Sequence, residues 1–427
     1  RALAVIPVIL FHAGFELFSG GFIGVDVFFV ISGYLITTVL IEDIENKRFS
    51  ILNFYERRAR RILPALFFIM ITCIPFAWMW MLPSQMKDFS QSLVAVSLFL
   101  SNVLFWLESD YFAAASEEKP LLHTWSLAVE EQYYLLFPIF LILFWRFGKN
   151  KVFWTIFIIA LISLLLSELG WRKEPSANFY LSFTRVWELF AGSLVAFIVK
   201  KNGVQKNNFL AIIGLTAIIF SIFFYDETTP FPSLYALVPV LGVVLFVLYA
   251  EKETLAAKFL SRKLFVGIGL ISYSAYLWHQ PLFAFARVRL SEYPSSLLMA
   301  MLSSTSIVLA YFSWRYVEKP FRESSNLGQK LIFLFSLIGL VSFLVIGFIG
   351  YKTNGFVNFI TTAEQREILS TAAHSPKRIE CHSGDNDHLT YKDSCEYFSK
   401  NISVAVLGDS HTVELSYALA EELQKKI

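Results

Sequence analysis

Long apolar stretches separated by short polar segments dominate the first 350 residues of this 427-residue chain. A helix needs about 20 predominantly apolar residues to cross the hydrocarbon core of a membrane. The pattern predicts eleven spans, near residues 2–17, 22–41, 62–82, 126–145, 152–169, 183–199, 209–225, 235–250, 264–286, 296–314 and 331–350. The expected fold is an all-α polytopic membrane bundle of about ten spans followed by an eleventh, linking span.

One further apolar segment, 89–107, contains Ser97, Ser101 and Asn102 and does not clearly span. If it does not cross, the basic loops all lie on one side of the membrane. These loops cover residues 47–61, 146–151, 200–206, 252–263 and 315–330. The positive-inside rule makes that side cytoplasmic. We therefore predict a re-entrant or interfacial helix at 89–107, a cytoplasmic N-terminus, and an extracytoplasmic tail after about residue 351.

Composition agrees with a multi-pass membrane protein in contact with lipid. Hydrophobic residues make up 56% of the chain and charged residues 16%, against about 45–50% and 25% in soluble domains. A net charge of +2 does not indicate a nucleic-acid partner. We find no internal repeat, P-loop or zinc-ligand spacing, and we predict no metal.

The composition changes abruptly near residue 351, where a polar segment of mixed charge begins. Cys381 and Cys395 in this segment are expected to form a disulfide on the oxidising side of the membrane, with two free thiols as the alternative. Cys73, in the third span, is expected to serve packing. The chain is expected to be truncated at both ends, because it begins without methionine and stops one helix after the turn at 408–411.

Arg1 and His12 are eleven positions apart, with an otherwise apolar run between them. At about 100° per residue they share one helix face, roughly 16 Å apart along the axis. A titratable residue inside a membrane bundle is a candidate functional residue. The alternative is a histidine that is simply hydrogen-bonded within the packed bundle.

Two other runs bring charge into apolar helices. In residues 18–40, Gly20, Gly21, Gly24 and Gly33 permit close backbone approach, and Asp26 requires a partner or a proton. The glycines also fit a purely structural role in packing. In residues 184–194, Arg185 and Glu188 lie one turn apart and are expected to form an internal ion pair.

The run FYERRARRILP, residues 54–64, places four arginines ahead of the third span. Arginine is well suited to binding phosphate, so these side chains could hold a nucleotide-like ligand. A topology determinant in contact with anionic lipid would have the same composition.

Acidic and aromatic residues mark two further runs. Glu130 and Glu131 follow His123 and Trp125 in residues 121–138. Neighbouring residues of a helix point about 100° apart around its axis, so we expect only one of the two carboxylates to face a cavity. Such a carboxylate can accept or steer a proton from a sugar hydroxyl. Residues 271–283 contain Tyr273, Tyr276, Trp278 and His279. A belt of aromatic residues at the membrane interface explains the two tyrosines and the tryptophan, but it does not explain His279.

In this order the runs resemble the acyltransferase-3 family of integral-membrane O-acyltransferases, which modify bacterial surface polysaccharides. The resemblance covers roughly residues 1–325 and rests on the Arg1/His12 pair, GVDVFFVISGYL, RRARR, HTWSLAVEEQYYLLFP, RVWELFAGSL and SYSAYLWHQP. It implies ten spans in the catalytic domain and His12 as the catalytic histidine, with Glu130 in the functional set. It also implies acetyl-coenzyme A as the donor, presented from the cytoplasm and contacted by Arg1, Arg57, Arg58, Arg60 and Arg61.

The tail resembles the start of an α/β hydrolase domain of the SGNH type. Residues 402–411 fit a strand that leads into a nucleophile turn, with Ser410 as the nucleophile. The later oxyanion residues and the Asp-x-x-His pair of that family are absent from this chain, and His411 cannot be assumed to act as the base. We expect three parts: a membrane acyltransferase domain at 1–325, a linking helix at 326–352, and a periplasmic linker with the start of the SGNH-like domain at 353–427.

These expectations amount to an O-acyltransferase of the bacterial inner membrane. It would move an acyl group from cytoplasmic acyl-coenzyme A to a hydroxyl of an exported glycan such as O-antigen or lipopolysaccharide. Peptidoglycan is the alternative acceptor, and a proton-coupled transporter is the alternative from another class. The sequence leaves the oligomeric state open.

Overall fold

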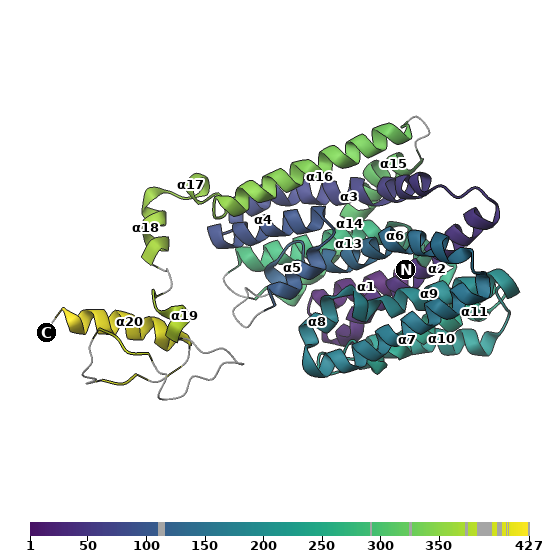
Figure 1. Ribbon diagram of the computed structural model, residues 1–427, viewed down its shortest axis with the longest axis horizontal. Helices are drawn as coiled ribbons and strands as arrows, with labels where there is room; N and C mark the ends of the chain where they lie inside the picture. Colours follow the sequence, from purple (N-terminus) through teal and green to yellow (C-terminus); the bar gives the residue numbers. More distant parts are fainter. Residues whose placement is uncertain are drawn as a thin grey trace. The chain divides into compact units, whose positions relative to one another are not determined.

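The computed structural model describes residues 1–109, 116–290, 293–323, 327–371, 375–381, 395–398, 404–406, 408 and 410–425. The chain forms two compact units, Arg1–Phe356 and Val357–Ile427. Across these described residues, every regular element is a helix, apart from one isolated bridge between Lys206 and Ala250 (Figure 1).

The first unit is a bundle of long helices joined by short turns. In chain order its first half contains α1 (Ala2–His12), the 3₁₀ helix η1 (Glu16–Ile23), α2 (Gly24–Glu45), α3 (Ile51–Trp80), α4 (Pro83–Ser97), α5 (Ser101–Leu107), η2 (Ser116–Glu118), α6 (Thr124–Trp145), α7 (Lys149–Lys173), α8 (Pro175–Tyr180) and α9 (Ser182–Asn202). Its second half contains α10 (Asn208–Phe224), η3 (Leu234–Ala236), α11 (Leu237–Tyr249), α12 (Leu255–Leu260), α13 (Lys263–Arg289), α14 (Ser296–Ser313), the π-helical turn η4 (Trp314–Glu318), α15 (Lys319–Glu323) and α16 (Gln329–Lys352). Helix α16 lies alongside α3 and α4 (Figure 1).

Several of these helices have the length and apolar composition of membrane spans. Among the described residues, seven continuous helical stretches qualify: Glu16–Glu45, Ile51–Trp80, Thr124–Trp145, Lys149–Lys173, Pro175–Asn202, Ser296–Glu323 and Gln329–Lys352. Three shorter apolar helices accompany them, at Ala2–His12, Asn208–Phe224 and Leu234–Tyr249. The predicted all-α, multi-pass membrane bundle is thus confirmed, while the number of crossings stays a prediction.

Three predicted segments differ from the structure by more than a shift of a few residues at their ends. The first predicted span, 2–17, is a helix of only 11 residues, because the chain turns at Gly14 with φ +78° and continues as η1. The segment 89–107 is split between α4 and α5, with Phe99 at φ +54° in the break. Helix α3 begins at Ile51, eleven residues before the span predicted at 62–82. The four arginines therefore lie on a helix and not in a loop.

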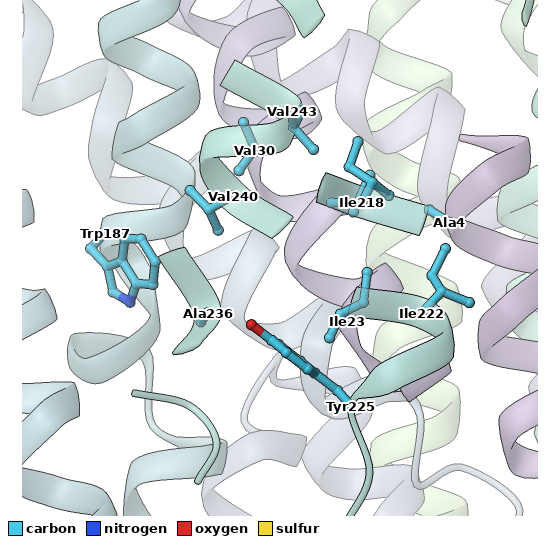
Figure 2. Close-up of a cluster of buried hydrophobic side chains, with 11 residues drawn as sticks. Ala4, Ile23, Val30, Trp187, Ile218, Ile222, Tyr225, Ala236, Val240 and Val243 are labelled. Atoms are coloured by element: carbon cyan, nitrogen blue, oxygen red, sulfur yellow. The ribbon is translucent and has the colours of Figure 1, made fainter. Parts of the chain in front are cut away.

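A buried apolar cluster joins the N-terminal helices to α9, α10 and α11 (Figure 2). Its members are Ala4, Ile23, Val27, Val30, Trp187, Ile218, Ile222, Tyr225, Ala236, Val240 and Val243. Because lipid is as apolar as these side chains, tight packing and not escape from water must hold such helices together.

Glycines bring α2 and α9 into direct backbone contact. A Cβ on Gly33 would overlap the backbone oxygen of Leu189, and a Cβ on Gly192 would overlap that of Val30. Each helix therefore supplies a glycine at the point where the other helix presses closest. The predicted packing role of glycines in residues 18–40 is confirmed, since a Cβ on any of them would also overlap a neighbouring backbone oxygen.

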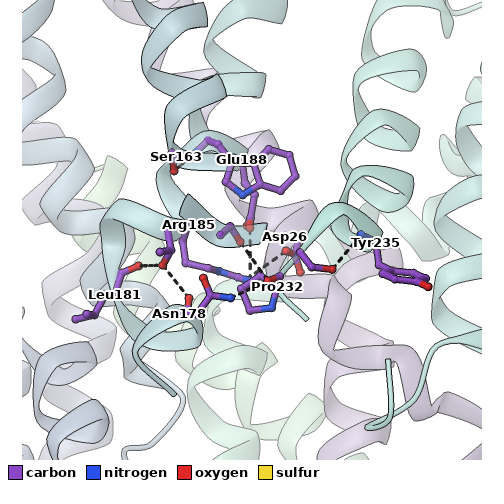
Figure 3. Close-up of polar contacts among 12 residues, drawn as sticks. Asp26, Ser163, Asn178, Leu181, Arg185, Glu188, Pro232 and Tyr235 are labelled. Atoms are coloured by element: carbon purple, nitrogen blue, oxygen red, sulfur yellow. Dashed lines mark hydrogen bonds and ion pairs between the residues drawn. The ribbon is translucent and has the colours of Figure 1, made fainter. Parts of the chain in front are cut away.

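A buried ion network joins the same two helices (Figure 3). The Arg185 guanidinium of α9 lies 3.2 Å from the Asp26 carboxylate of α2 and 3.5 Å from Glu188. All three side chains are at most 1% exposed. The predicted internal pair of Arg185 and Glu188 is confirmed, and Asp26 proves to share the same arginine.

Aromatic rings surround this guanidinium on several sides. Its central carbon lies 5.5–5.8 Å from four ring centroids. The rings belong to Phe29, Trp125, Phe179 and Phe231. Ring faces attract a cation, so helices α2, α6 and α8 and the segment before η3 all contact the charge that pairs α2 with α9.

The second unit contains short helices: α17 (Val357–Ile360), α18 (Ala363–Thr371), α19 (Arg378–Cys381) and α20 (Ser410–Gln424). A disulfide links Cys381 to Cys395, as predicted, and Arg378 pairs with Glu414. Its described residues include no strand. The strand predicted within 402–411 falls partly outside the described residues, which omit 402, 403, 407 and 409. An α/β layer therefore stays a prediction.

The close contact of α2 and α9 predicts that Gly33→Ala and Gly192→Ala each destabilise the bundle, by about 1–3 kcal/mol, because the added methyl group must push two backbones apart. Thermal unfolding of the detergent-solubilised protein measures the effect. Gly267→Ala in α13 is the matched control, since no atom lies within 4 Å of its added Cβ. Equal stability of Gly192→Ala and Gly267→Ala would contradict the proposed contact.

Candidate active site

Helix α1 places its two polar ends against two points of α13. The nearest atom to a Cβ built on Gly269 is the Arg1 Cβ, at 3.8 Å. At the other end, the His12 Nδ1 lies 3.3 Å from the His279 Nε2. Arg1 and His12 therefore both lie beside α13, as their spacing on one helix face predicts.

A pocket of about 780 Å³, counting the open solvent at its mouth, lies beside Arg1. This volume is within the range of small-molecule binding sites. Its lining comes from α1, α2, α3, α6 and α13 and combines cations, a carboxylate, hydroxyl groups and apolar side chains. The polar lining residues are Arg1, Ser32, Arg58, Arg61, Ser126, Glu130, Tyr134, Ser272, Tyr273 and Tyr276.

Two of the four clustered arginines line this pocket and two do not. Arg58 and Arg61 are three positions apart on α3 and share the face toward the pocket. Arg57 instead pairs with Asp43 at 2.7 Å, and Arg60 pairs with Glu56 at 2.6 Å. Neither Arg58 nor Arg61 forms an ion pair with any other described residue. Their charges are thus available to a ligand in the pocket.

One carboxylate faces these cations. The Ser32 hydroxyl donates to Glu130 Oε1 at 2.7 Å, and the Tyr134 hydroxyl donates to Glu130 Oε2 at 3.2 Å. Glu131 is absent from the pocket lining. The structure therefore confirms that only one of the adjacent glutamates faces the cavity, and it holds that glutamate with two hydrogen bonds.

Three histidines lie close together beside the pocket. They are His12, His123 and His279, and we call them the histidine cluster. The ring centroids of His12 and His279 are 5.2 Å apart, and those of His123 and His279 are 5.5 Å apart. Arg287 donates to the backbone oxygen of His12 at 2.7 Å and fixes the end of α1. No group of three or more His, Cys, Asp or Glu residues in the described part of the chain is arranged to hold a metal ion.

Tyr276 connects the pocket to the histidine cluster. Its side chain lines the pocket, and its hydroxyl donates to the backbone oxygen of His123 at 3.0 Å. The backbone oxygen of Tyr276 lies 2.6 Å from His279 Nδ1. Ser126, also in the lining, lies 2.7 Å from the Tyr276 hydroxyl. Tyr276 thus forms part of the pocket wall and also contacts His123 and His279.

Comparison with known proteins assigns this arrangement to a family. A family profile described as "Acyltransferase domain" matches residues 1–315. The chain belongs to the acyltransferase-3 family. The O-acetyltransferase OatA of Staphylococcus aureus (strain NCTC 8325 / PS 47) is 33% identical over 345 residues, which cover 76% of this chain and 56% of the relative. The peptidoglycan O-acetyltransferase OatA of Listeria monocytogenes serovar 1/2a is 32% identical over 345 residues, covering 76% of this chain and 55% of the relative.

This acyltransferase-3 chain therefore spans just over half the length of these relatives. The family match covers α1 to α14, which contain the pocket and the histidine cluster. No solved structure matches the chain.

Several residues of this acyltransferase-3 site have surroundings that their local sequence does not predict. An interfacial aromatic belt is the wrong explanation for Tyr276 and Trp278, which are buried within the bundle. Ser32 and Tyr134, which hold Glu130, lie within the runs 18–40 and 121–138, but no local pattern marks either side chain as functional. Their positions on α2 and α6 become informative only when these helices are seen to pack together.

Ser410 belongs to the second unit, where it is the first residue of α20, and His411 follows it in the same helix. Its role as a nucleophile stays a prediction. The remaining predicted site residues group in the first unit, where Arg1, Arg58, Arg61 and Glu130 line the pocket and His12 lies in the adjoining histidine cluster.

Proposed function

We propose that this chain is a membrane O-acetyltransferase that moves an acetyl group from acetyl-coenzyme A to a hydroxyl group of a bacterial cell-surface glycan. The observation that carries the proposal is the pocket with Arg1, Arg58 and Arg61 in its lining and a tyrosine wall in contact with the histidine cluster. Membership of the acyltransferase-3 family supports acyl transfer over a proton-coupled transporter.

Peptidoglycan is the acceptor we favour. The Listeria relative is named a peptidoglycan O-acetyltransferase, and its similarity covers 76% of this chain. This support favours peptidoglycan over O-antigen or lipopolysaccharide, which the sequence alone put first.

In this proposal the donor binds with its phosphates at the three arginines. Coenzyme A carries phosphates at one end and the thioester at the other, and guanidinium groups bind phosphate oxygens through charged, paired hydrogen bonds. Glu130, held by Ser32 and Tyr134, is the one carboxylate among the described residues that line this pocket. Basic loops on the side of Arg58 and Arg61 support a cytoplasmic mouth for the pocket.

His12 is the proposed general base. It takes the proton from the acceptor hydroxyl while the oxygen attacks the thioester carbonyl carbon. A carbon–oxygen bond forms, the carbon–sulfur bond breaks, and the imidazolium returns its proton to the departing thiolate. The products are the acetyl ester and free coenzyme A.

Ser410 is a proposed acyl carrier on the extracytoplasmic side. Its hydroxyl would take the acetyl group from the ester that leaves the membrane site and release that ester's alcohol; a glycan hydroxyl would then take the acetyl group from the serine and release the free serine hydroxyl. Placement of the second unit outside the membrane follows from the predicted topology.

Arg58→Gln is expected to raise KM for acetyl-coenzyme A about tenfold or more with little change in kcat. The variant loses a charged hydrogen bond, worth about 1.5–3 kcal/mol, that acts in donor binding. Steady-state kinetics in detergent or membranes measure it. Arg57→Gln is the matched control, because Arg57 pairs with Asp43 and does not line the pocket. An equal rise in KM for both variants would place the donor elsewhere.

His12→Ala is expected to lower acetyl transfer by at least about 10²-fold, since it removes the general base. Mass spectrometry of muropeptides from cells that carry only this variant measures O-acetylation. Protein level and thermal unfolding of the purified variant confirm that it is folded. Wild-type acetylation by a folded His12→Ala protein would refute the proposed function.

Ser410→Ala tests the carrier separately. We expect the full-length protein, incubated with acetyl-coenzyme A, to yield an acetylated peptide containing Ser410, detected by mass spectrometry. The variant should lose both this adduct and transfer to the glycan. Full glycan acetylation by Ser410→Ala would remove Ser410 from the mechanism and leave the pocket proposal intact.

A further inference from the structure

The hydrogen bonds of His279 fix which of its nitrogens carries the proton. His279 is fully buried on α13, and its Nδ1 lies 2.6 Å from the backbone oxygen of Tyr276. A carbonyl oxygen can only accept, so His279 Nδ1 must be the N–H donor. In the neutral ring the other nitrogen, Nε2, then carries a lone pair and can only accept.

The protonation of His279 in turn fixes the tautomer of His12. His279 Nε2 lies 3.3 Å from His12 Nδ1. Because the first nitrogen accepts, His12 Nδ1 must donate its proton to it. The tautomer of His12 is therefore Nδ1–H, and its Nε2 holds the free lone pair. In a histidine, the hydrogen bond made by one ring nitrogen sets the state of the other.

We propose that His279 is a positioning residue that holds His12 in the reactive tautomer. This inference rests on the proposed role of His12 as the base. When His12 Nε2 takes the hydroxyl proton, its Nδ1–H stays hydrogen-bonded to His279, which stabilises the imidazolium until the proton passes to the leaving thiolate. A neutral imidazole here does what a carboxylate does in a Ser-His-Asp triad.

The surroundings fix this pair in place. Arg287 donates to the backbone oxygen of His12 at 2.7 Å and pairs with Glu117 at 3.0 Å. The series of hydrogen bonds that orients the base runs from the Tyr276 carbonyl through His279 to His12. His123 lies in the same cluster, but neither of its ring nitrogens has a hydrogen-bond partner among the described residues, so it does not take part in this series.

The test compares two substitutions of similar size. His279→Gln offers a side-chain carbonyl oxygen near the position of Nε2 and can accept from His12, whereas the thioether of His279→Met accepts only weakly. We expect kcat to fall by about 10²-fold in His279→Met, with KM for acetyl-coenzyme A unchanged. His279→Gln should recover at least about tenfold of that loss. Thermal unfolding checks that both variants are folded.

Nitrogen-15 NMR of histidine-labelled protein gives an independent readout. The His12 resonances are assigned by their loss in His12→Ala. We expect the Nδ1–H tautomer in wild type and in His279→Gln. An Nε2–H tautomer in wild type, or a kcat within about threefold of wild type in folded His279→Met, would overturn the inference. If His279→Met does not fold, the wild-type tautomer decides.

The two proposals fail in different ways. An active His12→Ala removes the proposed function and with it the need for a positioned base. An inactive His12→Ala combined with a fully active His279→Met removes only the role of His279.

Discussion

The buried ion network between α2 and α9 is the constraint on which the rest of the bundle depends. Arg185 and the two carboxylates have no access to water. Removing Arg185 would leave two buried carboxyl groups without a counter-charge, and breaking such a buried pair typically costs about 3–5 kcal/mol. Together with Gly33 and Gly192, the network fixes both the spacing and the register of the two helices.

That register determines the geometry of the pocket. Asp26 in the network and Ser32 in the pocket lie on the same helix, α2, and Ser32 donates to Glu130 of α6. A second link joins the three helices nearer the other end of α2, where Tyr133 lies within hydrogen-bonding distance of both Thr37 and Ser193. Helix α6 is thus held to α2 and α9 at polar contacts, and its carboxylate is presented to the arginines at a fixed position.

Local periodicity predicted much of this arrangement. Apolar length located the helices, and the spacing of Arg1 and His12 placed both beside one neighbour, α13. The offset of about 100° between neighbours on a helix separates Glu130 from Glu131 in the same way. The apolar pattern alone places the arginines in a loop ahead of the span, where no shared face can be predicted. On α3 the three-residue spacing of Arg58 and Arg61 gives them a shared face, whereas Arg57 and Arg60 pair with acidic residues outside the pocket lining.

Contacts across the bundle lay beyond such reasoning. His12 and His279 are 267 positions apart, and Tyr276 and His123 are 153 apart. Each histidine lies in a run that marks it as a candidate, but no local pattern distinguishes a histidine that is merely packed from one that contacts another histidine. The end of α1 at His12 could not be predicted from the apolar pattern either, because that pattern continues past Gly14, where the backbone turns.

The rise of α1 from Arg1 to His12 has a consequence for how a donor and a base can meet. Eleven residues rise about 16 Å, roughly half of a hydrocarbon core about 30 Å thick. If Arg1 lies at the membrane interface, His12 lies near mid-depth, and α1 ends there because the chain turns at Gly14. A donor held at the arginines then needs to reach only half-way, and the acceptor needs to approach only the other half.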